Sequence, residues 1–273
     1  MLGLRRERRA GAHLSAVVVL AAVSPLLAEP SLRAEQISQL VLGDTAETLE
    51  TRAEWRRVRL DRDGYEGWVH RGYMREWTRR ESDGWNERAR GWSEGAELDV
   101  GGKRVRLPLR ARVALVPDGV LLPDGRAGPV VQGAVRRFAE VTAESRAMPA
   151  EEWAARRFLG APYQWGGVTP WGVDCSGLVQ TTFAARGLML PRDSAQQATA
   201  GDQVATAALA PGDLLFFRGE FGNGITHVAF AAAGETLVHA TVACGGVVRE
   251  SWRPGTRAAA LRERLVVVRR VGG

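Results

Sequence analysis

The stretch GVDCSGLVQTTFAARG, residues 172–187, decides the fold of the second half of the chain. Asp174 is a residue type that caps helix N-termini, and Gly187 is a residue type that ends helices. Between them the apolar residues fall on one stripe at helical spacing. The stretch therefore predicts a helix over 175–186, with Cys175 as its first residue.

A thiol at that position has several possible roles. Free N–H groups and the positive end of the helix dipole would lower the pKa of Cys175 and favour the thiolate, whereas the carboxylate of Asp174 opposes this. A small buried hydrophobe is the alternative reading. The chain has two cysteines, too few for a disulfide scaffold, and we expect Cys244 to be a buried thiol and not a disulfide partner. A nucleophilic Cys175 would need a base.

Two of the four histidines of the chain provide a candidate base. His227 and His239 fall on predicted strands over 225–232 and 236–242. If AGE, residues 233–235, forms a three-residue hairpin loop, both imidazoles point to the same face within reach of one another. A two-residue loop would place them on opposite faces. The three-residue reading gives a nucleophile, a base and a second histidine that orients the base.

The surrounding elements indicate a mixed architecture. Pro149, followed by two glutamates, predicts a helix start within 145–160. A turn into a strand follows at 210–219, and a strand over 264–271 closes the chain. Helices followed by a run of strands are typical of α+β domains.

An internal repeat organises the first half of the chain. DGYEGWVHRGYM (63–74) and DGRAGPVVQGAV (124–135) share the pattern D-G-x-x-G-x-V-x-x-G. A short strand-like run precedes each copy, and Asp-Gly between such runs is a hairpin signal. We therefore expect two small β-modules, over 16–78 and 86–143. The second copy has Pro129 where the first has Trp68, so we interpret the second module as a spacer or packing element.

The motifs YQWGGVTPWGVDCSGLVQ, LPRDSAQQ, PGDLLFF, ITHVAF and LVHAT resemble the NlpC/P60 family of papain-like cysteine peptidases, and the two repeats look like bacterial SH3 modules. The resemblance predicts an α+β fold with a papain-like NlpC/P60 catalytic domain over 146–273, preceded by two small SH3-like β-barrels. It implies that Cys175 is the nucleophile, His227 the base and His239 the polar third residue. Tyr163 would donate its hydroxyl near the oxyanion site, together with the Cys175 N–H.

The whole arrangement is similar to enzymes of the dipeptidyl-peptidase VI type. These hydrolyse the γ-D-glutamyl–diamino acid bond of peptidoglycan stem peptides with a free N-terminal L-alanine, and their first module walls off the amino end of the substrate. The substrate-binding candidates that the resemblance gives are Asp193, Ser194, Asp174, Ser176, Tyr73 and Glu35. Asp193 is the expected partner of the substrate ammonium, and a helix cap is the alternative role of Asp174.

Two other functions stay open. One is a non-catalytic cell-wall-binding protein with a relic catalytic unit. The other is an amidase or acyltransferase on the same thiol scaffold. The intact set of Cys, two His and Tyr favours the peptidase.

Composition narrows the range of partners. The net charge is +6, but 31 acidic residues are interspersed with the cations and no groove-reading motif is present, so we expect no nucleic-acid partner. No metal or organic cofactor is indicated. We expect a monomer that takes a murein peptide as substrate and does not insert stably into a membrane.

The amino terminus allows two interpretations. A basic start and an apolar stretch of signal-peptide length occupy residues 1–28, but the residues around Ala28 make a poor cleavage site. The same apolar stretch can be the first strand and turn of a folded module. We expect the second reading, with residues 1–15 a basic tail and the protein cytoplasmic. A secreted or cell-envelope protein is the alternative, if residues 1–28 are a signal peptide.

Overall fold

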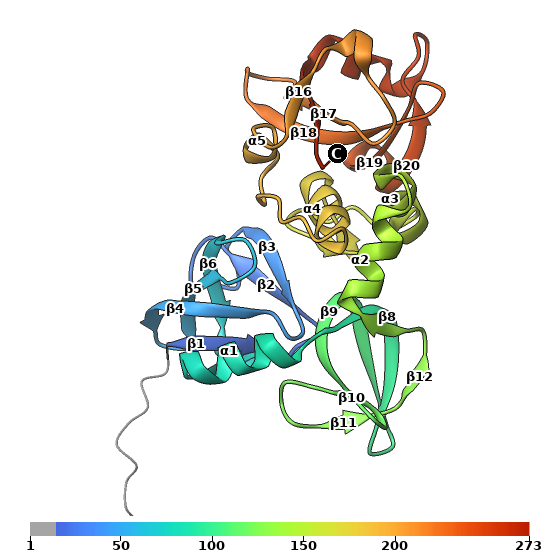
Figure 1. Cartoon of the computed structure of the whole chain (residues 1–273). Helices are drawn as coiled ribbons and strands as arrows, with labels where there is room; N and C mark the ends of the chain where they lie inside the picture. The colour runs from blue at the N-terminus through green and yellow to red at the C-terminus, as the bar shows by residue number, and fades with distance from the viewer. Residues whose placement is uncertain (1–14, 273) are drawn as a thin grey trace, which may run out of the picture.

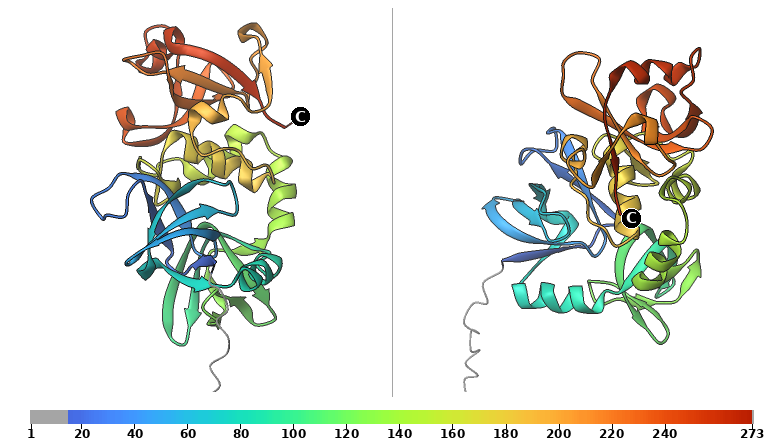
Figure 2. Two further views of the ribbon diagram at one scale, coloured as in Figure 1. Left: turned by 90° about the vertical axis from the view of Figure 1, so that its left-hand side faces the viewer. Right: turned by 45° about the horizontal axis from the view of Figure 1, so that its top comes forward.

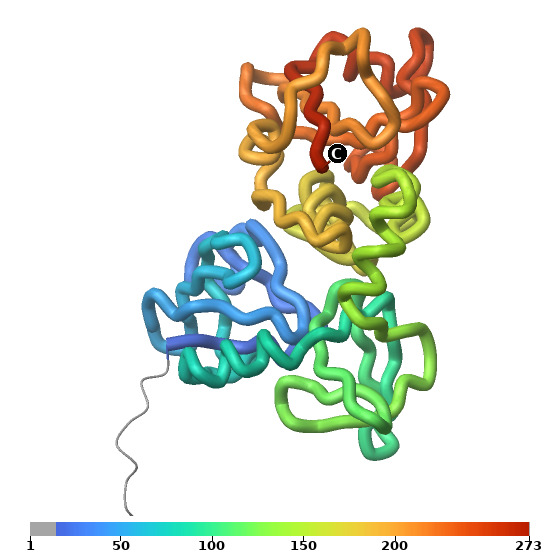
Figure 3. The backbone as a smooth tube through the Cα atoms, viewed as in Figure 1, coloured from blue at the N-terminus to red at the C-terminus, as the bar shows by residue number. Residues whose placement is uncertain are grey.

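Three large β-sheets follow one another along the chain in the computed structural model, which describes residues 15–272 (Figures 1 and 3). The first two sheets lie together below the C-terminal part in these views. The predicted basic tail falls almost entirely on residues 1–14, outside the described residues. Within the described part of the chain, none of the helices has the length and apolar character needed to cross a membrane.

The first sheet has seven strands in the order β3-β2-β6-β5-β4-β1-β7. They are β1 (Ala16–Val19), β2 (Val23–Leu27), β3 (Gln36–Val41), β4 (Thr45–Arg52), β5 (Trp55–Leu60), β6 (Glu66–His70) and β7 (Met74–Trp77). In β5, Val58 and Leu60 are buried whereas Arg57 and Arg59 are exposed, the period of two that puts one face on a core. The apolar stretch near the amino terminus forms β1 and β2, which confirms that it folds as strand.

The second sheet follows helix α1 (Arg79–Arg88), which begins with a capping box between Thr78 and Glu81. Its strands are β8 (Gly91–Val100), β9 (Lys103–Val116), β10 (Gly119–Leu121), β11 (Ala127–Gly128), β12 (Val130–Gln132) and β13 (Val135–Arg137). Both copies of the D-G repeat form the predicted hairpins, β5–β6 and β10–β11. The path of strand pairing among the described residues is open in both sheets, so two closed barrels are not confirmed.

The C-terminal part combines helices with a third sheet, which is the mixed composition expected from the sequence. The helices are α2 (Phe138–Arg146), α3 (Ala150–Phe158), α4 (Cys175–Ala185) and α5 (Ser194–Gln197). The strands are β16 (Asp202–Val204), β17 (Leu214–Arg218), β18 (Ile225–Ala232), β19 (Thr236–Thr241), β20 (Gly246–Ser251) and β21 (Leu265–Arg270), in the order β16-β21-β17-β18-β19-β20. Pro149 directly precedes α3 and marks its start as predicted.

Helix α4 lies at the centre of this part (Figures 1 and 2). All of its residues are buried, not only the predicted apolar stripe. Phe183 stacks on Phe230 of β18 with ring centroids 6.1 Å apart. Burying an aromatic side chain of this size contributes roughly 2–3 kcal/mol to stability. The helix is enclosed on every side because it packs on the third sheet and also meets the two N-terminal sheets.

Polar side chains of α4 make the contacts with the N-terminal sheets. Gln180 donates from Nε2 to Oδ2 of Asp63 at 3.0 Å, in the turn between β5 and β6. Thr181 Oγ1 accepts a hydrogen bond of 3.0 Å from Nη1 of Arg110, which lies on β9. Buried polar groups must be paired to avoid a desolvation cost. These pairs therefore fix the first two sheets against the helix that begins with the thiol.

Candidate active site

Cys175 is the first residue of α4, as the sequence predicts. The Asp174 side chain caps the helix by accepting a hydrogen bond of 2.7 Å from the Gly177 N–H. The Cys175 side chain is buried, and its Sγ lies 4.0 Å from the carbonyl oxygen of Thr226, the residue before His227. The helix start and strand β18 thus bring the thiol to the segment that carries the predicted base.

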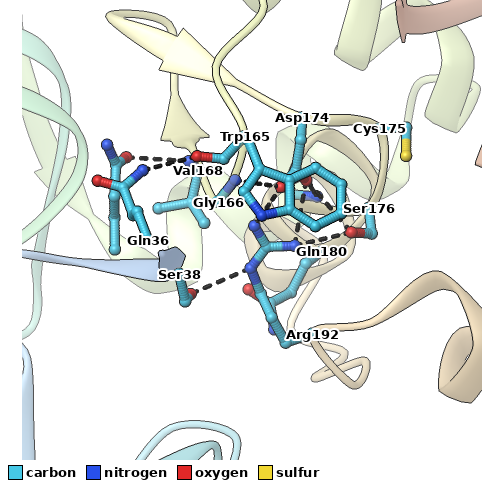
Figure 4. A network of polar contacts seen from close by, with 12 residues as sticks. Gln36, Ser38, Trp165, Gly166, Val168, Asp174, Cys175, Ser176, Gln180 and Arg192 are labelled. Carbon is cyan, nitrogen blue, oxygen red and sulfur yellow. Dashed lines mark hydrogen bonds and ion pairs between the residues drawn. The ribbon is translucent and has the colours of Figure 1, made fainter. Parts of the chain in front are cut away.

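Asp174 is also half of a buried ion pair. Nη2 of Arg192 lies 2.5 Å from its Oδ2, and Nη1 of Arg192 contacts both Asp174 Oδ1 and Ser176 Oγ. The Gly166 N–H donates to Asp174 at 2.8 Å. Figure 4 shows Cys175 pointing away from this network. Protein groups occupy its carboxylate, which favours the alternative role of Asp174 as a helix cap, while its predicted substrate contact stays a prediction. Ser176 belongs to the same network.

The network continues into the first sheet. Nε of Arg192 donates to Ser38 Oγ on β3 at 3.0 Å (Figure 4). Gln36 at the start of β3 donates to the Trp165 carbonyl at 2.7 Å. Trp165 in turn donates from Nε1 to the Glu35 carboxylate at 2.8 Å. Strand β3 therefore supports the loop that leads into Asp174, and the predicted residue Glu35 lies at this junction.

His227 and His239 meet as predicted. The β18–β19 register pairs Phe230 with Val238 and leaves residues 233–235 as the loop, so the hairpin has the three-residue connection. Nε2 of His227 lies 2.8 Å from Nδ1 of His239. The sequence reasoning missed the next member: Glu250 on β20, whose Oε1 lies 2.7 Å from His239 Nε2.

The order of these contacts assigns the protons on both rings. Burial works to raise the pKa of Glu250, but the hydrogen bond from His239 and the charge of Arg257 outweigh it and lower that pKa. An ionised carboxylate only accepts, so His239 carries its proton on Nε2 and a neutral His239 accepts at Nδ1. His227 then donates from Nε2. This leaves Nδ1 of His227 as the unprotonated nitrogen that can act as a base.

Electrostatics keep both partners of the thiol–imidazole pair neutral before substrate binds. Burial, followed by the charge of Asp174, raises the pKa of Cys175 to about 12. Burial, with the neighbouring His239, lowers the pKa of His227 to about 3. The backbone hydrogen bonds at the helix start and the charge of Arg192 act to lower this pKa, as expected of a helix N-terminus, but burial and Asp174 outweigh them. The thiol proton must leave during the attack, and a neutral His227 is suited to take it.

Tyr163 packs against the core cluster that contains Cys175. Its backbone N–H donates to the Gly245 carbonyl at 2.8 Å, and the residue bridges to Val173 just before Asp174. Burial first, and then the negative charge of Asp174, raise the pKa of Tyr163. A hydroxyl that stays protonated can donate to a developing oxyanion, which is the role predicted for this residue.

At the predicted amine-binding end, Tyr65 contacts Asp193, whereas Tyr73 was the expected tyrosine. The Tyr65 hydroxyl donates to both carboxylate oxygens of Asp193, at 3.0 and 3.2 Å, and thus links the first sheet to the N-cap of α5. Ser194 is buried next to Asp193. Tyr73 is instead partly buried, packs against the core of the first sheet and meets the ring of His70 edge to face. Tyr65 and Tyr73 belong to the same copy of the repeat, and no signal in that copy distinguishes between them.

Cys244 corrects one further expectation. It ends the short helical turn η3 (Val242–Cys244) and is exposed, not buried. Both cysteines are free thiols within the described residues. The turn ends at Gly245, which has a left-handed φ of 69° and starts the chain into β20. Cys244 therefore belongs to a surface turn, although its sequence neighbours are apolar.

A helix N-terminal thiol close to a strand that carries a histidine pair is the arrangement of a cysteine-type hydrolase. Comparison with protein families agrees: residues 160–265 match the NlpC/P60 family, and residues 26–72 match the bacterial dipeptidyl-peptidase SH3 domain. The chain therefore carries an NlpC/P60 peptidase domain preceded by a bacterial SH3 domain. The SH3 match does not extend into the second sheet.

Two curated relatives resemble the catalytic part of the chain. The γ-D-glutamyl-L-lysine dipeptidyl-peptidase of Bacillus subtilis (strain 168) is 46% identical over 83 residues, which are 30% of this chain and 28% of that protein. The probable endopeptidase NlpC of Escherichia coli (strain K12) is 43% identical over 93 residues, which are 34% of this chain and 60% of that protein. The matches thus span less than two thirds of each relative.

A solved structure extends the likeness to nearly the whole fold. The crystal structure of an NlpC/P60 family protein from Bacillus cereus superposes with a TM-score of 0.75. The match covers 94% of this chain and 99% of that chain, at 21% sequence identity. At this identity the likeness concerns the fold alone, and it includes both N-terminal sheets.

Proposed function

We propose that this protein is a cysteine endopeptidase that hydrolyses the γ-D-glutamyl–diamino acid bond of peptidoglycan stem peptides with a free N-terminal L-alanine. One observation carries the proposal: the domain that holds the thiol and the histidine pair is contacted by the first sheet through the hydrogen bond from Tyr65 to Asp193. The name of the Bacillus subtilis relative supports this bond as the target.

The proposed reaction has two stages. Nδ1 of His227 takes the proton of the Cys175 thiol as Sγ attacks the γ-glutamyl carbonyl carbon. The resulting oxyanion is held by the Tyr163 hydroxyl and the Cys175 N–H. The C–N bond then breaks, and His227 gives its proton to the leaving amine. Water, deprotonated by His227, attacks the thioester and releases L-Ala-γ-D-Glu and free thiol.

Asp193 supports selection for a free amino terminus. Its carboxylate is partly buried and hydrogen-bonded by Tyr65, and it has the charge needed to pair with an ammonium. Ser194, and Glu35 through Trp165, lie at the same junction between the first sheet and the catalytic domain. A longer chain extending beyond L-alanine would meet the first sheet, so two residues are removed at each cleavage.

Mass spectrometry of peptide products tests this function. Purified protein is incubated with L-Ala-γ-D-Glu-diaminopimelate and with an N-acetylated copy, and Cys175→Ala protein serves as the control. We expect L-Ala-γ-D-Glu only from the free-amine peptide and only with the native thiol. Retention of insoluble wall without any soluble product would favour the wall-binding alternative, and a product of a different mass would favour an amidase or acyltransferase.

We further propose that the chain divides at 16–78, 86–143 and 146–273, with the second range an SH3-like spacer. The β10–β11 hairpin, at the place of β5–β6 in the repeat, supports the likeness. The contact from Arg110 to α4 supports a packing role. Limited proteolysis of the full chain tests the boundaries, and light scattering tests the expected monomer. Cleavage inside β8 or β9 before the linkers would contradict the division.

We also propose a cytoplasmic location. Cleavage after Ala28 would remove β1 and β2 from the first sheet, and β1 pairs with both β4 and β7. A module that has lost these strands could not close the substrate site. Cell fractionation with amino-terminal sequencing tests the proposal. A protein in the envelope that begins at Glu29 would contradict it.

A further inference from the structure

A pocket adjoins the histidine pair on the C-terminal sheet. It has a volume of about 380 Å³, and His227 and His239 form part of its wall. The end of β17, the end of β19 and the helical segment η4 (Arg257–Arg264) supply the rest. Neither Asp193 nor any residue of the first two sheets lines it, so it is separate from the amine-binding end.

The pocket is rich in guanidinium groups. Arg218, Arg257 and Arg264 line it, against a single acidic side chain, Glu220. Arg264 Nη2 lies 3.8 Å from Glu220 Oε1, too far for a hydrogen bond, and Glu220 is 64% exposed. Arg218 donates one hydrogen bond, to the Glu263 carbonyl at 3.1 Å. Each guanidinium has five N–H donors, so the pocket offers more donors than the protein itself uses.

The proposed reaction determines which half of the substrate reaches this pocket. His227 protonates the leaving amine, so the residue that bears this amine must lie next to His227. The acyl half lies toward Asp193 and the first sheet, which the pocket does not touch. The remaining groups of the leaving diamino acid are therefore directed to the side of His227 on which the arginines lie.

We propose that the pocket lined by Arg218, Arg257 and Arg264 binds a carboxylate of the leaving diamino acid. This inference rests on the proposed function and deepens it. Arginine suits the task because its planar fork matches a carboxylate in a bidentate geometry. The carboxylate has two possible sources, the α-carboxylate of a C-terminal lysine or diaminopimelate and the side-chain carboxylate of diaminopimelate. Binding of the α-carboxylate would favour a peptide that ends at the diamino acid. Binding of the side-chain carboxylate would favour diaminopimelate over lysine, whether or not the peptide continues.

Three peptides separate the possible sources. They share L-Ala-γ-D-Glu and end in L-lysine with a free carboxylate, in L-lysine amide, or in diaminopimelate amidated at its α-carboxyl group. We expect the lysine acid or the diaminopimelate amide, or both, to exceed the lysine amide in kcat/KM by about three- to fivefold, the range for a partly exposed charge pair. The peptide that gains identifies which carboxylate is bound.

Arg264→Gln tests the pocket itself. Among the described residues, Arg264 forms an ion pair with the exposed Glu220 alone. Arg257 forms an ion pair with Glu250, the carboxylate that contacts His239, so Arg257 is left intact. We expect the preference for the carboxylate peptide to fall to near one in Arg264→Gln and to fall in Arg218→Gln as well. Arg253→Gln is the matched control, because it removes an exposed arginine of the same domain that pairs with Glu235 outside the pocket.

The outcomes distinguish this inference from the proposed function. If the native protein cleaves all three peptides with equal kcat/KM, the carboxylate site is wrong and the peptidase stands. If Arg253→Gln reduces the preference as much as Arg264→Gln and Arg218→Gln, overall charge and not the pocket is responsible, and the inference is wrong. If none of the peptides is cleaved, the proposed function fails, and this inference fails with it.

Discussion

The carboxylate of Glu250 lies 2.7 Å from Nε2 of His239, the ring nitrogen opposite the one that meets His227. Glu250 thereby fixes the ring orientation and proton position of His239, and His239 does the same for His227. The carboxylate does not touch the thiol. It acts as a positioning residue whose effect reaches the reaction through two imidazoles.

Glu250→Gln tests this relay. An amide can donate to His239 Nε2 and favour the wrong tautomer, so we expect kcat to fall by about tenfold, below the hundredfold or more of a direct general base, with little change in KM. The pH profile of kcat should also move, which a loss of packing alone would not produce. Glu235→Gln, an exposed glutamate of the same domain, is the matched control. An unchanged kcat and pH profile in Glu250→Gln would contradict the relay.

Arg192 tests how the helix start is held. Its side chain is buried and pairs with Asp174 while it also bonds Ser38 of the first sheet. Removing one partner of a buried pair leaves an unpaired charge, so we expect Arg192→Ala to lower the free energy of unfolding by about 3–5 kcal/mol. Urea denaturation measures this.

Arg253→Ala provides the comparison for that experiment. The pair of Arg253 with Glu235 is more than half exposed on both sides. Exposed pairs contribute about 0–1 kcal/mol. Equal losses in the two variants would mean that the Arg192 network does not anchor the site.

The depressed pKa of His227 predicts a dependence of stability on pH. The pKa is lowered from 6.5 to about 3, so between these values the unfolded chain binds a proton that the folded protein does not. Stability is therefore complete above pH 6.5 and falls as the pH drops toward 3. In His227→Gln this contribution is absent, and the urea midpoint should fall less steeply over that range. His70→Gln is the control, and identical slopes in native protein and His227→Gln would contradict the assignment.

The Tyr65–Asp193 contact predicts which substitutions affect the amine-binding end. Asp193→Asn removes the charge that would pair with the substrate ammonium. Charged hydrogen bonds contribute about 1.5–3 kcal/mol, so kcat/KM for a free-amine peptide should fall by at least about tenfold. The ratio of kcat/KM for the free-amine peptide to kcat/KM for the N-acetylated peptide should also fall in Asp193→Asn.

Two tyrosine variants separate the contact from its surroundings. Tyr65→Phe removes the hydroxyl that orients Asp193 and should reduce kcat/KM in the same direction but by less. Tyr73→Phe removes the same atom from a tyrosine that packs against the core of the first sheet. An equal effect of the two variants would mean that Tyr65 has no special relation to the substrate.

Local signals made part of the site predictable from the sequence. The Asp174 cap depends on residues within one helical turn, and the meeting of His227 with His239 depends only on a three-residue loop. Glu250 depends on the β19–β20 register, which is set by the turn η3 and the left-handed Gly245. The Gly-Gly pair at 245–246 signals a turn but not its length, so the register of the following strand and the place of the carboxylate could not be predicted.

Contacts between the first sheet and the catalytic domain could not be predicted from local sequence signals either. Tyr65 and Tyr73 occur eight residues apart, and only the docking of the first sheet on the catalytic domain determines which of them meets Asp193. The N-terminal sheets also contact α4 through Asp63 and Arg110, and all residues of this helix are buried. A helix considered alone has a solvated N-terminus, so the desolvation that raises the pKa of Cys175 could not be derived from its sequence.

The most direct test of the central claim is trapping of the acyl-enzyme. The protein is mixed with L-Ala-γ-D-Glu-diaminopimelate, quenched in acid within milliseconds, digested and analysed by mass spectrometry. We expect the L-Ala-γ-D-Glu acyl group as a thioester on the peptide that contains Cys175, and none on the peptide that contains Cys244. Product formation without any adduct on Cys175, or undiminished turnover by Cys175→Ala, would contradict the account.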